Sequence, residues 1–183
     1  MARVPYLDRD DSSAESKALW DRLEAERKMP TGNIFRAMAN APVLLDAFLS
    51  YANALRDGSE LGPRLRELAV LTVGHATGSE YEIAHHQSHG RKAGISPEQL
   101  AAVPEFETSD LFDDADRAVM ALAKESTQHV NVSDATWSAA AARLSEQQMV
   151  ELALTIAWYN SGVRIMGLLD IDLEDTYHDP KNS

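Results

Sequence analysis

Apolar residues recur three and four positions apart along most of this 183-residue chain, and no stretch alternates apolar and polar residues as a half-buried β-strand does. That spacing gathers apolar side chains on one face of an α-helix, where they can pack against other helices. Proline and glycine interrupt the pattern at the places where helices are expected to begin and end. The sequence therefore predicts an all-α fold.

The predicted helices carry local signals at their ends. Pro42, Pro63 and Pro97 suit first helical positions, where no backbone N–H is needed, and Gly58 and Gly94 suit helix ends. Hydroxyl groups stand at capping positions: Ser12 and Ser145, each followed three residues later by Glu15 or Gln148, and Ser79 and Ser96. The expected helices are residues 13–27, 33–41, 42–57, 63–76, 79–94, 96–103, 115–129, 134–144 and 145–169.

Charge and hydropathy exclude several classes of protein. A formal net charge of −12, with no local run of Lys or Arg, disfavours binding to nucleic acid or to anionic lipid. The longest apolar stretch, roughly Leu152 to Val163, is far shorter than the ~20 residues of a membrane helix. The start MARVPYLDRDD has no signal-peptide pattern. We therefore expect a cytoplasmic protein with no membrane segment.

Cysteine is absent from the whole sequence. The chain therefore has no disulfide, no zinc-thiolate site, no thiol nucleophile and no dithiol redox pair. Any chemistry must come from carboxylate, imidazole, hydroxyl, amine or guanidinium groups.

Glu67 is an anomaly in the most apolar predicted helix. Its neighbours in PRLRELAVLTVGHA are mainly leucine, valine and alanine, and an ionised carboxylate is costly in such surroundings unless it is paired. The partner could be a catalytic group. It could equally be an arginine in a structural ion pair, with Arg64, Arg66 or Arg164 as candidates.

Glu82 and His86 lie one turn apart on one face of the next predicted helix, with Ser79 one turn earlier. A carboxylate beside an imidazole can fix its tautomer and raise its pKa, which suits a general acid or base near neutral pH. The same spacing also occurs in solvated surface salt bridges. Both interpretations stay open on spacing alone.

A metal site is a further alternative. Glu82 and His85 have the Glu-x-x-His spacing used in di-iron bundles, and His89 lies one turn after His85. Such a site needs a second motif of the same kind, and Glu125 with His129 has a different spacing. We therefore predict no metal site.

Three stretches together make the sequence recognisable. They are RLREL at 64–68, TGSEYEIAHH at 77–86 and AGIS at 93–96. This arrangement resembles the carboxymuconolactone decarboxylase family within the AhpD-like superfamily. The resemblance is best from Ala41 to Val103, and the tail AWYNSGVRIMGLLDIDLE also resembles longer members.

The resemblance implies specific roles. The two cysteines of the alkylhydroperoxidase branch would fall on Ser79 and Glu82, so thiol peroxidase activity is not expected here. The decarboxylase branch implies that Glu67, Glu82 and His86 are catalytic. We expect His86 to deliver a proton, Glu82 to orient its ring and Glu67 to tune its protonation.

The resemblance also implies the overall organisation. We expect a single AhpD-like helical domain over residues 1–183, with an N-terminal extension (1–40), a family-like core (41–125) and C-terminal helices (126–183). The implied function is a cofactor-free lyase that decarboxylates a small unsaturated lactone or organic acid from aromatic catabolism. The expected oligomer is a homodimer, homotrimer or homohexamer. A non-catalytic oligomer that binds a small molecule is the alternative.

Other side chains are candidates for binding the substrate. Aromatic and polar groups near the motif and in the last helix could line its site, although such residues are more often ordinary core. The predicted substrate-binding residues are Tyr81, His85, Tyr159, Asn160 and Arg164. Because the protein is acidic, we also expect Arg64, Arg91 or Arg164 to complement a substrate carboxylate.

Overall fold

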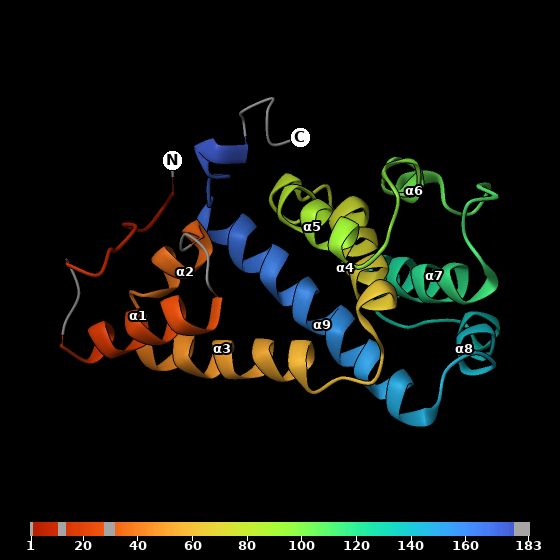
Figure 1. The fold of residues 1–183 in the computed structure, drawn as a ribbon, viewed down its shortest axis with the longest axis horizontal. Coiled ribbons are helices and arrows are strands. Elements are labelled where there is room, and N and C mark those ends of the chain that lie inside the picture. Colours follow the sequence, from red (N-terminus) through yellow and green to blue (C-terminus); the bar gives the residue numbers. More distant parts are fainter. Residues whose placement is uncertain (1, 11–13, 28–31, 178–183) are drawn as a thin grey trace. The chain divides into compact units, whose positions relative to one another are not determined.

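The structure is a computed structural model that describes residues 2–10, 14–27 and 32–177 (Figure 1). Within these residues the secondary structure is helical and contains no β-strand, so the all-α prediction is confirmed. The α-helices are α1 (Ala14–Arg27), α2 (Asn33–Met38), α3 (Pro42–Asp57), α4 (Pro63–Thr77), α5 (Glu80–Lys92), α6 (Pro97–Ala102), α7 (Asp114–His129), α8 (Asp134–Ala141) and α9 (Glu146–Leu169). Two short 3₁₀ turns are η1 (Val103–Glu105) and η2 (Asp175–Tyr177).

The helix ends follow the local signals. Helix α4 begins at Pro63 and ends at Gly78, whose φ of 66° is the left-handed conformation that glycine adopts without steric cost. The Ser96 side chain and the Gln99 side chain form a reciprocal capping box at α6. The box predicted at Ser145 also forms, since its hydroxyl accepts from Gln148 N at 3.2 Å.

Two predicted helices end at other residues than expected, and one predicted capping box falls on residues whose side chains the structure does not describe. Expected helices 33–41 and 134–144 end earlier, at Met38 and Ala141. The Ser12–Glu15 capping box lies outside the described side chains. Ala39 and Ala142 are the C-caps of these two helices, so the last residues of both expected ranges lie beyond the helix ends.

The chain divides into two compact units, residues 1–53 with 164–183 and residues 54–163. The first unit has its own apolar core, made by Leu19, Trp20, Leu23, Ala39, Leu45 and Leu49. Side chains of this unit also bind its C-terminal segment, because Asn33 donates to the carbonyl of Asp172 at 3.0 Å. The expected division into one domain with three parts stays a prediction.

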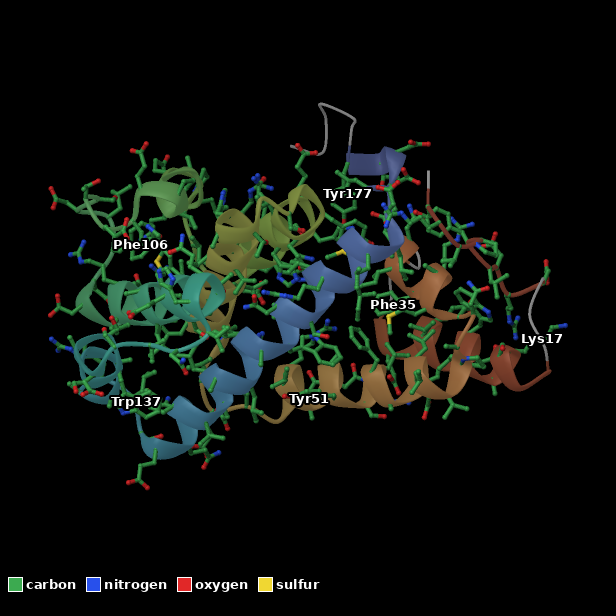
Figure 2. The ribbon with its side chains drawn as sticks, turned by 180° about the vertical axis from the view of Figure 1, so that it is seen from behind. Lys17, Phe35, Tyr51, Phe106, Trp137 and Tyr177 are labelled. Atoms are coloured by element: carbon green, nitrogen blue, oxygen red, sulfur yellow. The ribbon has the colours of Figure 1, made fainter. Side chains whose placement is uncertain are left out.

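Helix α4 is the centre of the second unit. Every residue from Glu67 to Gly74 is buried, as predicted for a helix that is apolar on most faces. It packs against α5 and α7, and Figure 1 shows α4 and α5 side by side. The core around it contains Leu68, Leu71, Ile95, Leu100, Val103, Phe106, Phe112 and Met120. Phe106, labelled in Figure 2, lies between α6 and α7.

An ion pair ties α4 to α7 within this unit. Arg64 donates to Asp116 from Nε to Oδ1 at 3.1 Å and from Nη2 to Oδ2 at 2.7 Å. The Asp116 side chain is only 3% exposed. The same guanidinium donates to the carbonyl of Gly94 at 3.1 Å, at the end of the turn that leaves α5. Arg64 therefore fixes the position of α4, and with it of Glu67, against two neighbouring segments.

In the part of the chain that the structure covers, no helix combines the length and the apolar character needed to cross a membrane.

Candidate active site

Glu67 on α4 and His86 on α5 meet where the two helices pack. The Nδ1 atom of His86 lies 2.6 Å from Oε2 of Glu67, a short hydrogen bond of the kind formed between charged partners. Glu67 is 5% exposed and the His86 side chain 13% exposed. The buried carboxylate therefore has a histidine as its closest partner, as the catalytic interpretation of Glu67 requires.

Arg66 is a second, more distant partner of Glu67. Its Nε lies 3.5 Å from Oε1 of Glu67, and its Nη1 donates to the carbonyl of Arg56 at 3.1 Å. The structural ion pair considered from the sequence is thus present in a weaker form, beside the short bond to His86.

Glu82 lies on the other side of the His86 ring. Its Oε2 is 3.4 Å from Nε2 of His86, longer than an ordinary hydrogen bond, and its side chain is 10% exposed. The two carboxylates thus face opposite nitrogens of one imidazole. The three predicted catalytic residues are brought together in a single buried cluster.

Two further aromatic rings touch His86. Tyr159 of α9 meets it edge to face, with ring centroids 5.0 Å apart at 89°. His89, one turn further along α5, lies with its centroid 5.3 Å from that of His86. The imidazole is therefore enclosed by α4, α5 and α9, within residues 54–163.

The shifts in pKa show how the cluster holds its protons. Burial alone would lower the pKa of His86, but the hydrogen bond and charge of Glu67 and the charge of Glu82 raise it above its ordinary value. Burial would raise the pKa of Glu67, but the hydrogen bond and charge of His86 hold it below its ordinary value. Each partner thus favours the ionised form of the other, which widens the pH range of the ion pair beyond pH 4.5–6.5, the interval between their ordinary pKa values.

The remaining groups favour their neutral forms. Burial raises the pKa of Glu82, and the nearby charge of Glu67 adds to this, so both outweigh the attraction of His86 and His85. Burial and the charge of His86 lower the pKa of His89 to about 4. Burial, followed by the charges of Glu67 and Glu82, raises the pKa of Tyr159. The pKa shifts of these three groups all favour the neutral form, in contrast to the shifts of Glu67 and His86.

Ser79 begins the helix that carries the cluster. It is the N-cap of α5, and its hydroxyl accepts a hydrogen bond from Glu82 N at 3.3 Å. The hydroxyl thereby serves the backbone of α5 and fixes where the helix starts. Glu82 and His86 then follow one turn apart on the same face, as predicted.

Four of the predicted substrate-binding residues lie at three different places around α5 and α9. Tyr159 lies against His86, as described above. Tyr81 and His85 stack on each other on the neighbouring stripe of α5, with centroids 4.3 Å apart. Asn160 donates to the Thr127 hydroxyl at 2.9 Å and so links α9 to α7.

The role of Arg64, Arg91 or Arg164 in complementing a substrate carboxylate stays a prediction. Arg64 binds Asp116, and Arg91 and Arg164 are exposed, with Arg164 in the other unit. Among the described residues, the arginine charges that act on the cluster are those of Arg66 on Glu67 and Arg56 on His86. Arg66 directly precedes Glu67 in the sequence, which was a usable signal. Arg56 lies in a different helix, and the sequence alone gave no reason to connect it with the site.

His89 and Gly162 were also not expected to belong to the site. His89 is three residues after His86, a spacing that puts both on nearly the same helical face. Gly162 is buried on α9, and a Cβ atom placed there would lie 3.4 Å from Oε1 of Glu82. Only the packing of α9 against α5 reveals that proximity.

No group of three or more His, Asp or Glu side chains arranged to hold a metal ion occurs among the described residues. The cluster is built instead around one short hydrogen bond between a carboxylate and an imidazole.

Fold and site define a class of protein: an all-α chain whose central helix pair buries a histidine between two glutamates. The model of the carboxymuconolactone decarboxylase family matches residues 42–125, the part of the chain that carries Glu67, Glu82 and His86. The family resemblance predicted from the motifs around Glu67 and His86 is therefore confirmed.

Several solved structures are similar over nearly the whole chain. A Cys-to-Ala variant of the debrominase Bmp8, in complex with 2,3,4-tribromopyrrole, matches with a TM-score of 0.83 at 21% identity, covering 97% of this chain and 95% of that one. An uncharacterized peroxidase-related protein from Silicibacter sp. TM1040 matches with a TM-score of 0.81 at 18% identity. The match covers 96% of this chain and 92% of that one. A peroxidase-related protein with an alkylhydroperoxidase AhpD core from Ralstonia eutropha JMP134 also matches with a TM-score of 0.81 at 18% identity. The match covers 96% of this chain and 94% of that one.

At these identities the likeness shows the fold alone, and the predicted AhpD-like fold is confirmed. A search of the curated proteins finds no match to this chain.

Proposed function

We propose that this protein is a cofactor-free acid/base enzyme that decarboxylates a small unsaturated lactone or organic acid, or carries out a closely related proton transfer. The observation that carries the proposal is the buried Glu67–His86 pair, with Nδ1 and Oε2 2.6 Å apart. A histidine held protonated by a carboxylate is suited to deliver a proton near neutral pH.

The distances around His86 support different tasks for its two nitrogens. Nδ1 is engaged by Glu67, which therefore orients the ring and stabilises its charge. Nε2 is 3.4 Å from Glu82, too far for a strong hydrogen bond, so its N–H is available to a substrate. This exchanges the roles expected from the sequence, in which Glu82 orients and Glu67 tunes.

The reaction balances with these groups alone. Cleavage of the bond to the carboxylate releases carbon dioxide, and its electron pair moves into the conjugated carbonyl to give a dienolate. The dienolate carbon then takes the proton from Nε2 of His86. The neutral imidazole regains a proton from solvent, so one proton is consumed for each carbon dioxide released.

The burial of the cluster favours an enzyme over a binding protein. A binding protein that had lost its chemistry would have no reason to maintain a buried ionised pair, which costs desolvation energy. Glu67 and His86 are both largely buried. The complex of the debrominase Bmp8 with 2,3,4-tribromopyrrole supports a small unsaturated ring as the kind of ligand that this fold accepts.

A cytoplasmic homo-oligomer is part of the proposal. Val150 and Leu154 lie on α9, four residues apart, with 59% and 42% of their surface exposed. Neighbouring exposed apolar side chains on one helix face suit burial against another copy. Sedimentation equilibrium would give a dimer, trimer or hexamer mass if this is correct, and a monomer mass at high concentration would contradict it.

The test is an assay of carbon dioxide release from a panel of carboxylated unsaturated lactones and related acids. The wild type is compared with His86→Gln and Glu67→Gln, and with His129→Gln as a control on an exposed histidine. Release by the wild type and the control, and loss of release in both site variants, would support the proposal. Release that survives in His86→Gln, or no release across the panel, would reject it.

A further inference from the structure

The carboxyl group of Glu82 has one oxygen without a partner. Its Oε2 faces Nε2 of His86 at 3.4 Å, and among the described residues no hydrogen bond involves Oε1. The side chain is nevertheless nine-tenths buried. A buried polar oxygen without a partner is costly, and its usual explanation is a ligand, a water molecule or a functional role.

Gly162 lies directly opposite this oxygen. A Cβ atom placed on Gly162 would lie 3.4 Å from Oε1, and apart from its chain neighbours and its own helix backbone no other atom of the described residues would come within 4 Å of it. The missing side chain of Gly162 therefore leaves a space of about one methyl group, centred 3.4 Å from Oε1. An alanine methyl would fill that space at van der Waals distance and keep a ligand oxygen from approaching to the ~2.6 Å of a short O–H···O bond.

The charges around Glu82 favour a protonated carboxyl. Glu67 carries a negative charge on the far side of His86, and burial together with that charge raises the pKa of Glu82 despite the attraction of His86 and His85. Only one of the two carboxylates is needed to balance the single charge of His86. A proton on Oε1 leaves Oε2 free to face the imidazolium.

We propose that Glu82 is a neutral carboxylic acid whose Oε1–H donates a hydrogen bond to a carbonyl or carboxyl oxygen of a small unsaturated ligand, seated in the space that Gly162 leaves open. Within the proposed function, the bound oxygen is that of the conjugated carbonyl, which becomes the dienolate oxygen when the carboxylate leaves as carbon dioxide. Glu82 then stabilises the developing negative charge and keeps its own proton, as protonated carboxyl groups in apolar oxyanion sites do.

The first experiment needs no substrate. Infrared spectra of the protein at pH 7 are compared with those of Glu82→Gln, and of Glu98→Gln as a control on an exposed glutamate. The carbonyl stretch of a protonated carboxylic acid should be present in the wild type and in Glu98→Gln and absent from Glu82→Gln. Absence of the band in the wild type, or its persistence in Glu82→Gln, would overturn the inference.

The second experiment uses but-2-enolide, a simple unsaturated lactone, as the probe. Gly162→Ala and Gly167→Ala both add one methyl group to α9, and a Cβ at Gly167 would meet nothing within 4 Å. Both changes favour the helix, so both variants should fold. The probe should shift the Glu82 carbonyl band in the wild type and in Gly167→Ala, and its dissociation constant should rise about tenfold or more in Gly162→Ala, as for one lost hydrogen bond.

Equal binding of the probe by Gly162→Ala and the wild type, or no band shift in the wild type, would overturn the inference. The inference rests on the proposed function only for the identity of the ligand. A Glu82 band that responds to the lactone in a protein that releases no carbon dioxide would uphold the subsite and reject the decarboxylase. Carbon dioxide release from a protein without a Glu82 band would reject the subsite and uphold the decarboxylase.

Discussion

His86 and Glu67 are 19 residues apart in the chain, yet Nδ1 and Oε2 are 2.6 Å apart, so α4 and α5 are joined by a charged hydrogen bond inside the core. Such a bond sets the orientation of the imidazole and its charge at the same time. The two effects can be separated by experiment, because an amide can keep the hydrogen bond without the charge.

Glu67→Gln should therefore lower kcat by on the order of 10²-fold while KM changes little, because the histidine loses the charge that holds its proton. In the same variant the pKa of His86 should fall toward or below its ordinary value of 6.5, since burial is then less opposed. The histidine resonances followed by NMR against pH would measure the shift. An unchanged His86 pKa would contradict the pairing.

The pH dependence of stability should also report the pair. The raised pKa of His86 contributes stability that is fully present below pH 6.5 and is lost as pH rises through its folded pKa. The lowered pKa of Glu67 contributes stability present above pH 4.5 and lost as pH falls through its folded pKa. Urea unfolding across the pH range should show both losses in the wild type and neither in the double variant Glu67→Gln/His86→Gln.

The contribution of Glu82 to stability should change with pH in the opposite direction to that of Glu67. A carboxyl with a raised folded pKa binds its proton more tightly in the folded state, so stability falls as pH rises from 4.5 to the folded pKa. The free energy of unfolding of Glu82→Gln, relative to the wild type, should therefore increase with pH over that window. A difference that is constant with pH would indicate that Glu82 ionises normally.

Arg64→Leu should cost about 3–5 kcal/mol of stability, because it leaves the buried carboxylate of Asp116 without its partner. Arg143→Leu is the matched control, since its partner Asp114 is 70% exposed and such a pair contributes at most about 1 kcal/mol. Chemical denaturation of both variants measures the contrast. Equal losses in the two variants would show that the burial of Asp116 is not what matters.

Val130 occupies a strained backbone conformation. Its φ of 67° and ψ of −58°, with a hydrogen bond from Asn131 N to the His129 carbonyl at 2.8 Å, form a γ-turn that is unfavourable for a β-branched residue. Val130 is 81% exposed, so removing its side chain loses little packing. Val130→Gly should raise the free energy of unfolding by about 1 kcal/mol. Val132→Gly, two residues later without a positive φ, should lower it instead.

Local features made most of the helices predictable. Pro63, Ser96 and Ser145 act through their own backbone and the next turn, so their effects can be read from a few neighbouring residues. The pairing of Glu67 was also accessible, because a carboxylate among aliphatic residues needs a partner and the next helix supplied one.

The finer geometry of the site depends on how the helices pack. Periodicity places Glu82 and His86 on one face, but it does not say which glutamate lies at 2.6 Å and which at 3.4 Å from the ring. It also does not say that Arg64 is bound by Asp116, or that Gly162 faces Glu82. Each of these depends on the rotation and spacing of two helices, which short sequence patterns do not encode.

The hydroxyl of Ser79 caps the start of α5, and the side chains of the cluster that follows carry only carboxyl, imidazole and phenol groups. A site of this composition has nothing for peroxide to oxidise or for a thiol reagent to alkylate. Its activity should therefore be indifferent to the redox state of its surroundings, and no reductase is needed to return it to its starting state after each turnover.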